Sequence, residues 1–148
     1  MTVNRIRQAC HEVLAKKEYL PKLDGTTFCN YGVHEILSKL GFPEFCWDQS
    51  KAQRPMLAND IAEKCENELC ELDIMNAFDA AKEGRIVLAA IKMPNHGHVA
   101  ILYPFPAPYY SGKWKREVPC VANIGKDNGI IPINWAFGAM PKFYEVKK

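Results

Sequence analysis

The stretch RIVLAAIKMPNHGHVAILYP, residues 85–104, decides the fold of this chain. It contains two strand-length apolar runs, Ile86 to Ile91 and His98 to Tyr103, joined by a short polar connection. Apolar runs of this length, bounded by turn residues, are typical of buried strands. The stretch therefore predicts two strands of one sheet, and the strand pattern begins directly after Gly84.

Helical spacing dominates the chain before Gly84. Four segments place apolar residues three and four positions apart, and in chain order they are 4–19, 28–40, 55–65 and 74–82. The second is the clearest, since Thr26 and Thr27 can cap its start and Gly41 can end it. Pro55 suits the first turn of the third helix. We therefore expect helices in the first part of the chain.

Strand patterns continue beyond the opening stretch. Val118 to Ile124 is a third apolar run, and Ile130 to Ile133 and Phe143 to Val146 predict short strands. We expect a turn at 135–139 between these last two. Segment 104–115 is rich in proline and aromatic residues and predicts an irregular connection. Helices grouped before an antiparallel sheet indicate an α+β fold.

The length and composition indicate one globular domain. The chain has 148 residues, of which 48% are hydrophobic and 24% are charged, a balance typical of folded proteins. We expect residues 1–148 to form one unit. It would consist of an N-terminal helix and turn (1–25), a helical part (26–84) and an antiparallel sheet part (85–148).

Charge and cysteine usage argue against several classes of function. The net charge is only +2, and Lys and Arg are scattered among Asp and Glu, so nucleic acid is not an expected partner. No apolar run approaches the roughly 20 residues that span a bilayer. Six cysteines at irregular spacing, without a CxxC pair, predict reduced thiols and neither a metal site nor a cofactor. The first 20 residues lack signal-peptide features, which predicts a protein that is cytoplasmic as synthesised.

One cysteine lies where thiol chemistry is favoured. Cys29, in the segment TTFCN (26–30), would occupy the first turn of the clearest helix, where free N–H groups and the helix dipole favour an anion. This setting lowers the pKa of a thiol, and the thiolate is the nucleophilic form. The same N–H groups can stabilise the oxyanion formed when a carbonyl is attacked. The alternative is that Cys29 is a small buried core residue.

A base and an orienting group are also present. His98 directly precedes the apolar run of its strand, whereas His96 lies in the preceding turn and is expected to be solvated; an outward-facing His98 is the alternative. Asn123 ends the third strand, where its side-chain carbonyl could orient an imidazole or where it could simply form a turn before Gly125. Asp127 is the substitute for the orienting role. Two further histidines are expected on helix surfaces, and they are His11 and His34.

Three short motifs occur in an order that resembles a known family. TFCN (27–30) is followed by a helix up to Gly41, then by Ala58-Asn59-Asp60, then by GHVAI (97–101) at a strand start. A polar residue ends the following strand. Over residues 26–125 this order resembles the papain-like NlpC and CHAP cysteine hydrolases of bacterial cell walls, which include peptidoglycan amidases and endopeptidases.

The resemblance implies a papain-like fold, with N-terminal helices packed on an antiparallel sheet, and a Cys-His-Asn mechanism without a cofactor. In this mechanism Cys29 attacks an amide carbonyl of a peptidoglycan stem peptide, and its backbone N–H forms part of the oxyanion hole. His98 deprotonates the thiol and later protonates the leaving amine, while Asn123 orients His98. Such a protein would need a phage holin or a secretion system to reach the wall.

Two other functions fit the same residues. An acyltransferase of the same fold would pass the acyl group from Cys29 to an amine or a lipid, depending on how well the cleft excludes water. A binding module would keep Cys29 in the core and use segment 103–114 as an aromatic recognition surface. In the catalytic alternatives, the residues expected to contact the substrate are Asn30, Trp47, Tyr109 and Trp135.

Overall fold

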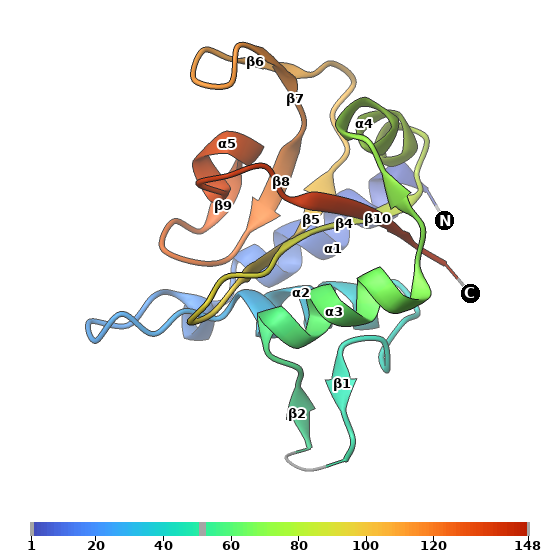
Figure 1. Cartoon of the computed structure of the whole chain (residues 1–148). Helices are drawn as coiled ribbons and strands as arrows, with labels where there is room; N and C mark the ends of the chain where they lie inside the picture. The colour runs from blue at the N-terminus through green and yellow to red at the C-terminus, as the bar shows by residue number, and fades with distance from the viewer. Residues whose placement is uncertain (1, 51–52, 148) are drawn as a thin grey trace.

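The computed structural model describes residues 2–50 and 53–147 and has an α+β architecture (Figure 1). The helices are α1 (Val3–Leu14), the 3-10 helix η1 (Lys17–Tyr19), α2 (Cys29–Lys39), α3 (Ala58–Glu68), α4 (Ile74–Lys82) and α5 (Ile133–Ala136). The main sheet contains β3 (Glu71–Leu72), β4 (Ile86–Ile91), β5 (His98–Tyr103), β8 (Cys120–Asn123), β9 (Gly129–Pro132) and β10 (Lys142–Val146). Two small hairpins pair β1 (Trp47–Asp48) with β2 (Arg54–Pro55), and β6 (Tyr109–Ser111) with β7 (Arg116–Val118).

Two polar residues lie at the ends of neighbouring strands in the main sheet. The order is β3-β10-β4-β5-β8-β9, and every neighbouring pair is antiparallel. Because β5 and β8 are neighbours that run in opposite directions, the start of β5 lies beside the end of β8. His98 is the first residue of β5 and Asn123 is the last residue of β8.

Both faces of the sheet are buried. Val99 and Ile101 of β5 face the core beneath α1, α2 and α3, whereas Ala100 and Leu102 face the core beneath α4 and α5. Figure 1 shows these two groups of helices on opposite sides of the sheet. A strand that is covered on both faces has apolar residues at nearly every position, which explains the continuous apolar runs in the sequence.

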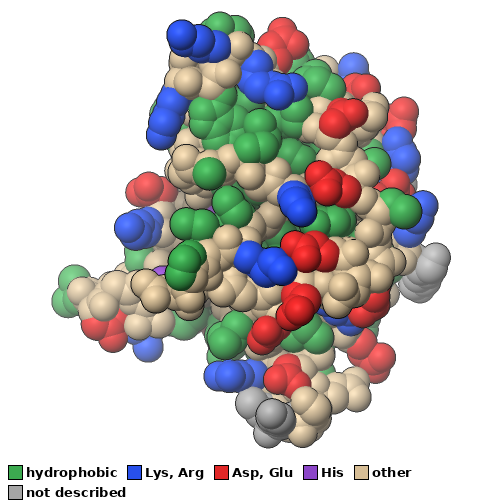
Figure 2. All heavy atoms as spheres, in the orientation of Figure 1, with side chains coloured by type: hydrophobic (Ala, Val, Ile, Leu, Met, Phe, Trp, Pro, Cys, Tyr) green, Lys and Arg blue, Asp and Glu red, His purple; other side chains and the backbone are tan. Residues whose placement is uncertain are grey.

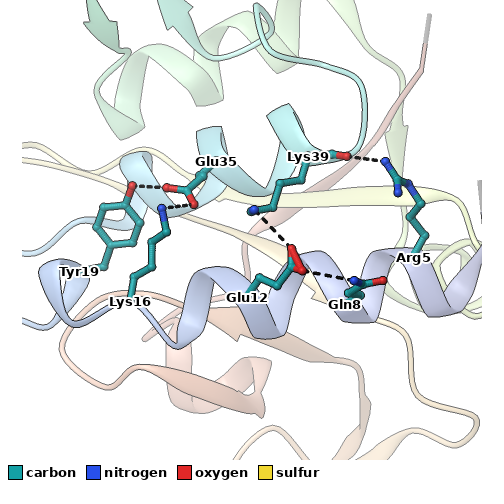
Figure 3. A network of polar contacts seen from close by, with 7 residues as sticks. All are labelled: Arg5, Gln8, Glu12, Lys16, Tyr19, Glu35 and Lys39. Carbon is teal, nitrogen blue, oxygen red and sulfur yellow. Dashed lines mark hydrogen bonds and ion pairs between the residues drawn. The ribbon is translucent and has the colours of Figure 1, made fainter.

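A polar network runs along α1 and α2, which lie side by side (Figure 3). The Lys39 ammonium lies 3.3 Å from Glu12, and Arg5 donates to the Lys39 carbonyl at 3.0 Å. At the other end, Lys16 pairs with Glu35. The exposed pair of Lys39 with Glu12 contributes little stability by itself, so the apolar contacts beneath the network hold the two helices together.

The sequence predicted the central elements at their observed bounds. This holds for α4 (74–82), β4 (86–91) and β5 (98–103), each bounded by residues that break its pattern. The predicted first helix ends at Leu14 and is followed by η1. The predicted third strand (118–124) is divided: Val118 ends β7, and β8 covers only Cys120–Asn123.

Three local expectations need correction. Pro55 lies in β2 rather than in a helix, because the Met56 N–H donates to the Cys46 carbonyl at 2.7 Å and keeps the chain extended there. The turn expected at 135–139 starts later, because Trp135 and Ala136 are the last residues of the short helix α5 and only residues 138–139 form a bend. The irregular connection at 104–115 contains β6, which pairs with β7.

No helix within the described residues combines the length and the apolar character needed to cross a bilayer. On the face of the molecule seen in Figure 2, Lys and Arg side chains are interspersed with Asp and Glu.

Candidate active site

Cys29 is the first residue of α2. The residue before the helix is Phe28, whose side chain forms no cap, so the expected capping by Thr26 or Thr27 was wrong. Thr26 belongs to the preceding turn, where its backbone N–H donates to Asp24 Oδ1, and Phe28 occupies the cap position. The N–H groups in the first turn of α2 therefore have no side-chain cap and can act on a group beside them.

A glycine brings α2 close to the end of β8. A Cβ atom at Gly32 would overlap the side chain of Ile124. Only glycine permits such a close approach of a helix to a neighbouring side chain. Ile124 directly follows Asn123. This contact therefore fixes the start of α2, where Cys29 lies, relative to the end of β8.

A cavity of about 630 Å³ lies over the start of β5 and the end of β8. Its walls include four residues that the sequence singled out together with Cys29, and these are Asn30, His98, Asn123 and Trp135. The Cys29 side chain is 8% exposed, so it is buried in the floor of the cavity. The volume lies within the usual range for sites that bind small molecules or peptide segments.

Burial raises the pKa of the Cys29 thiol, and backbone hydrogen bonds from Val99, Asn30 and Cys29 itself oppose this without cancelling it. The expected lowering of this pKa is therefore corrected: the helix start supplies N–H groups, but the loss of water around sulfur has the larger effect. Because the backbone of Val99 acts on the pKa of this thiol and Val99 follows His98 in β5, the sulfur lies near the start of that strand. The resting thiol is protonated at neutral pH, so nucleophilic attack requires a base.

A hydrogen bond with Asn123, which is itself held by a second bond, fixes the imidazole of His98. Its Nε2 lies 2.6 Å from Asn123 Oδ1, and Asn123 Nδ2 donates to the backbone carbonyl of Asp127 at 2.7 Å. Because that carbonyl can only accept, Asn123 turns its NH₂ group to Asp127 and its oxygen to His98. The imidazole therefore carries its proton on Nε2, which leaves the lone pair of Nδ1 to accept a proton.

The ring of His98 is also packed tightly. Its centroid lies 4.8 Å from that of Phe137, at an interplanar angle of 58°. Burial lowers the pKa of His98, and the hydrogen bond with Asn123 offsets only part of this effect. The neutral imidazole thus prevails at neutral pH, which is the form that a general base needs.

Asn59 holds the connection that leads to His98. Its side chain donates to the Met93 carbonyl at 2.8 Å and accepts from the Met93 N–H at 3.1 Å. A Cβ atom at Gly97 would overlap the Ile91 carbonyl and Asn59 Oδ1. Sequence reasoning gave Asn59 a place in a motif but no role, because its partner lies 34 positions later and no local pattern reveals it.

Two of the predicted substrate contacts line the cavity. Trp135, on α5, is 65% exposed and forms part of one wall. Leu57, just before α3, was not predicted as a contact, but it is 52% exposed and forms part of another wall. Asn30 also lines the cavity, although its Nδ2 donates to the Met56 carbonyl at 3.0 Å. Leu23 is fully exposed in the loop before α2, and Figure 2 shows hydrophobic atoms at the tip of that projecting loop. Trp135 and Leu57 thus make the wall of the cavity partly apolar.

The other two predicted contacts lie elsewhere. Tyr109 is on β6, which follows the far end of β5, a strand length away from His98. Trp47 follows the far end of α2, lines a second cavity and packs against His34, with ring centroids 5.1 Å apart. His34 is half-buried there rather than on the helix surface. Neither aromatic residue lines the cavity of Cys29.

No protein-family model matches this sequence, and no curated protein matches it. In the described part of the chain, no three His, Cys, Asp or Glu side chains gather as metal ligands would. What the cavity can do chemically follows from its own residues: a buried thiol, a neutral imidazole with a fixed tautomer, and free N–H groups at a helix start.

Proposed function

We propose that this protein is a papain-like thiol hydrolase, with an NlpC or CHAP type of fold, that cleaves an amide bond in peptidoglycan. One observation carries the proposal: Asn123 fixes the tautomer of His98 so that Nδ1 is the basic nitrogen, in the cavity that also contains Cys29. A thiol, a base and a group that orients the base are the parts that cysteine-dependent acyl transfer requires.

The reaction begins with transfer of the Cys29 proton to His98 Nδ1. The thiolate attacks the amide carbonyl, and the backbone N–H of Cys29 stabilises the oxyanion. The imidazolium then protonates the leaving amine as the carbon–nitrogen bond breaks, which produces an acyl-enzyme. Water, deprotonated by the same imidazole, hydrolyses the thioester and restores the thiol.

Asn123 contributes to both proton transfers. Its Oδ1 accepts from the Nε2–H of His98 whether the ring is neutral or charged. The bond raises the pKa of His98 within a site that otherwise lowers it, so it stabilises the imidazolium formed when Cys29 loses its proton. Asp127 acts only through its backbone carbonyl, which holds the Asn123 amide.

The walls of the cavity favour a peptide substrate with apolar groups near the scissile bond. Trp135 is on α5 and Leu57 directly precedes α3, a helix on the opposite face of the sheet, and each residue is more than half exposed. A stem peptide lying across Cys29 would cover both of them, and burial of this apolar area favours binding. In a wall hydrolase, these residues would determine which amide bond reaches the thiol.

The test is mass spectrometry of the soluble fragments released from purified peptidoglycan. We expect fragments from the wild type and from Cys70→Ser, which removes an exposed thiol outside the cavity, and none from Cys29→Ala. The mass of the fragments identifies the bond. Equal release by Cys29→Ala would remove Cys29 from the mechanism, whereas transfer of the acyl group to an added amine without hydrolysis would identify an acyltransferase.

A further inference from the structure

Asn128 holds the turn that follows β8. Its Oδ1 accepts from the Gly125 N–H at 2.8 Å, and its Nδ2 donates to the Tyr19 carbonyl at 2.8 Å. Each end of the amide has a partner of the matching kind, so its orientation is fixed. Asn128 is half-buried and does not line the cavity of Cys29, so it has no direct access to a substrate there.

Gly125 forms one side of the space that holds the His98 ring. A Cβ atom on Gly125 would lie 3.2 Å from His98 Cε1 and 3.5 Å from Asn123 Nδ2, so the backbone of Gly125 already borders both groups. The Phe137 ring packs against His98 as well. The position of the imidazole therefore depends on where the backbone of Gly125 is held.

Tyr19 connects this turn to the helix of the nucleophile. Its hydroxyl donates to Glu35 on α2 at 2.6 Å, and Figure 3 shows Lys16 pairing with the same carboxylate. The Tyr19 ring also packs near Phe28, the residue before Cys29, with ring centroids 6.2 Å apart. Tyr19 is thus attached to α2 by its side chain and to Asn128 by its carbonyl.

We propose that Asn128 is a positioning residue, which ties the turn behind His98 to Tyr19 and thereby sets the placement of the imidazole relative to the Cys29 thiol. The inference rests on the proposed function for its effect on turnover. The placement of the imidazole itself can be measured without a substrate.

The test compares Asn128→Ala with Asn76→Ala. Asn76 is a matched control, because its Nδ2 donates to Asp73 at 2.8 Å at the start of α4, on the other side of the sheet. In Asn128→Ala we expect kcat to fall on the order of 10-fold to 100-fold with KM unchanged, since a small misplacement of a base slows proton transfer. We expect no such change in Asn76→Ala.

A second readout separates positioning from folding. Nuclear magnetic resonance titration of the His98 ring should give a higher pKa in Asn128→Ala than in the wild type, because a loosened turn admits water around a ring whose pKa is lowered by burial. Asn76→Ala should leave this pKa unchanged. If Asn128→Ala does not fold, Asn128→Gln keeps both ends of the amide on a longer stem and should give a smaller shift in the same direction.

The outcomes distinguish this inference from the proposed function. If the wild type releases nothing from peptidoglycan while Asn128→Ala still shifts the His98 pKa, the proposed substrate is wrong and the positioning role stands. An unchanged His98 titration in the folded variant, with kcat reduced no more than in Asn76→Ala, would overturn the positioning role.

Discussion

Burial shifts the pKa values of the two reactive side chains in the cavity in opposite directions. Burial raises the pKa of the Cys29 thiol and lowers that of the His98 imidazole, so both groups are neutral in the resting site. An ion pair between thiolate and imidazolium is therefore not the resting state. The proton moves when the substrate is attacked, and the Nδ1 lone pair left free by the Asn123 contact receives it.

The pH dependence of hydrolysis should reflect this neutral pair. We expect kcat/KM to rise with pH through a midpoint below the usual histidine value of about 6.5, and to stay level past the usual thiol value of about 8.5. The lowered pKa of His98 moves the rising limb to lower pH, because the base must be unprotonated. The raised pKa of Cys29 removes a limb near the usual thiol value, because the thiol must still hold its proton. Other titratable groups that line the cavity are Asp60, His96, Lys126 and Asp127.

A profile of kcat/KM measured from pH 4 to pH 11 on a released-fragment assay checks this expectation. A rising limb near pH 8 would contradict it, since that limb would report formation of a thiolate before substrate binding.

At the scale of elements, the contact of α2 with the end of β8 sets the position of the Cys29 thiol relative to the His98 imidazole. Gly32→Ala inserts a methyl group into the space of the Ile124 side chain, so α2 must shift or Ile124 must adopt another rotamer. Overpacking of this kind costs about 1–3 kcal/mol of unfolding free energy. Because Cys29 precedes Gly32 by less than one helical turn, proton transfer from its thiol to the imidazole, and therefore alkylation of the thiol, should also slow.

Urea unfolding and the rate of Cys29 alkylation, both in a Cys70→Ser background, measure the two effects. Gly112→Ala is the matched control, because a Cβ atom there meets nothing within 4 Å. Equal stability and equal alkylation rates in the two glycine variants would show that the contact does not position the helix.

Elements also explain where the sequence was informative about the site. Cys29, His98 and Asn123 each lie at an element end that local patterns predicted. Antiparallel pairing of β5 and β8 brings His98 and Asn123 together, and the contact of Gly32 with Ile124 brings the start of α2 to them. Trp47 and Tyr109 follow the opposite ends of α2 and β5, which a list of aromatic residues does not reveal. Residues that act through long-range partners, such as Asn59 and Asn128, carried no local signal of that role.

At the scale of the whole molecule, the sequence predicted helices before strands but not the strand order. β10 lies between β3 and β4, so residue 143 pairs with residues 72 and 89. Such pairings depend on how the entire chain buries both faces of the sheet, and period-2 or helical spacing does not specify them.

Acid sensitivity of the fold should depend on the network of Tyr19, Lys16 and Glu35. Burial would raise the pKa of Glu35, but hydrogen bonds from Lys16 and Tyr19 outweigh it, so the pKa is lowered. A lowered carboxyl pKa stabilises the folded state above the unfolded value of about 4.3, and the contribution is lost as pH falls through the folded value.

Tyr19→Phe removes one of these bonds and keeps the ring. It should reduce the unfolding free energy by about 1 kcal/mol at pH 7 and by less at pH 3, where the carboxyl is increasingly protonated. Urea unfolding at the two pH values measures the difference. An equal loss at both would mean that the Tyr19 hydroxyl contributes independently of the Glu35 charge.

The exposed Cys70 offers a point of attachment. It follows α3, whose first residues border the cavity, and the 11 residues of that helix place the thiol about 16 Å from them at about 1.5 Å per residue. The other thiols of the described residues are buried or half-buried. A bulky maleimide should therefore couple to Cys70 before it reaches Cys29, so the protein can be tethered to a bead or carry a fluorophore while its cleft faces an insoluble polymer.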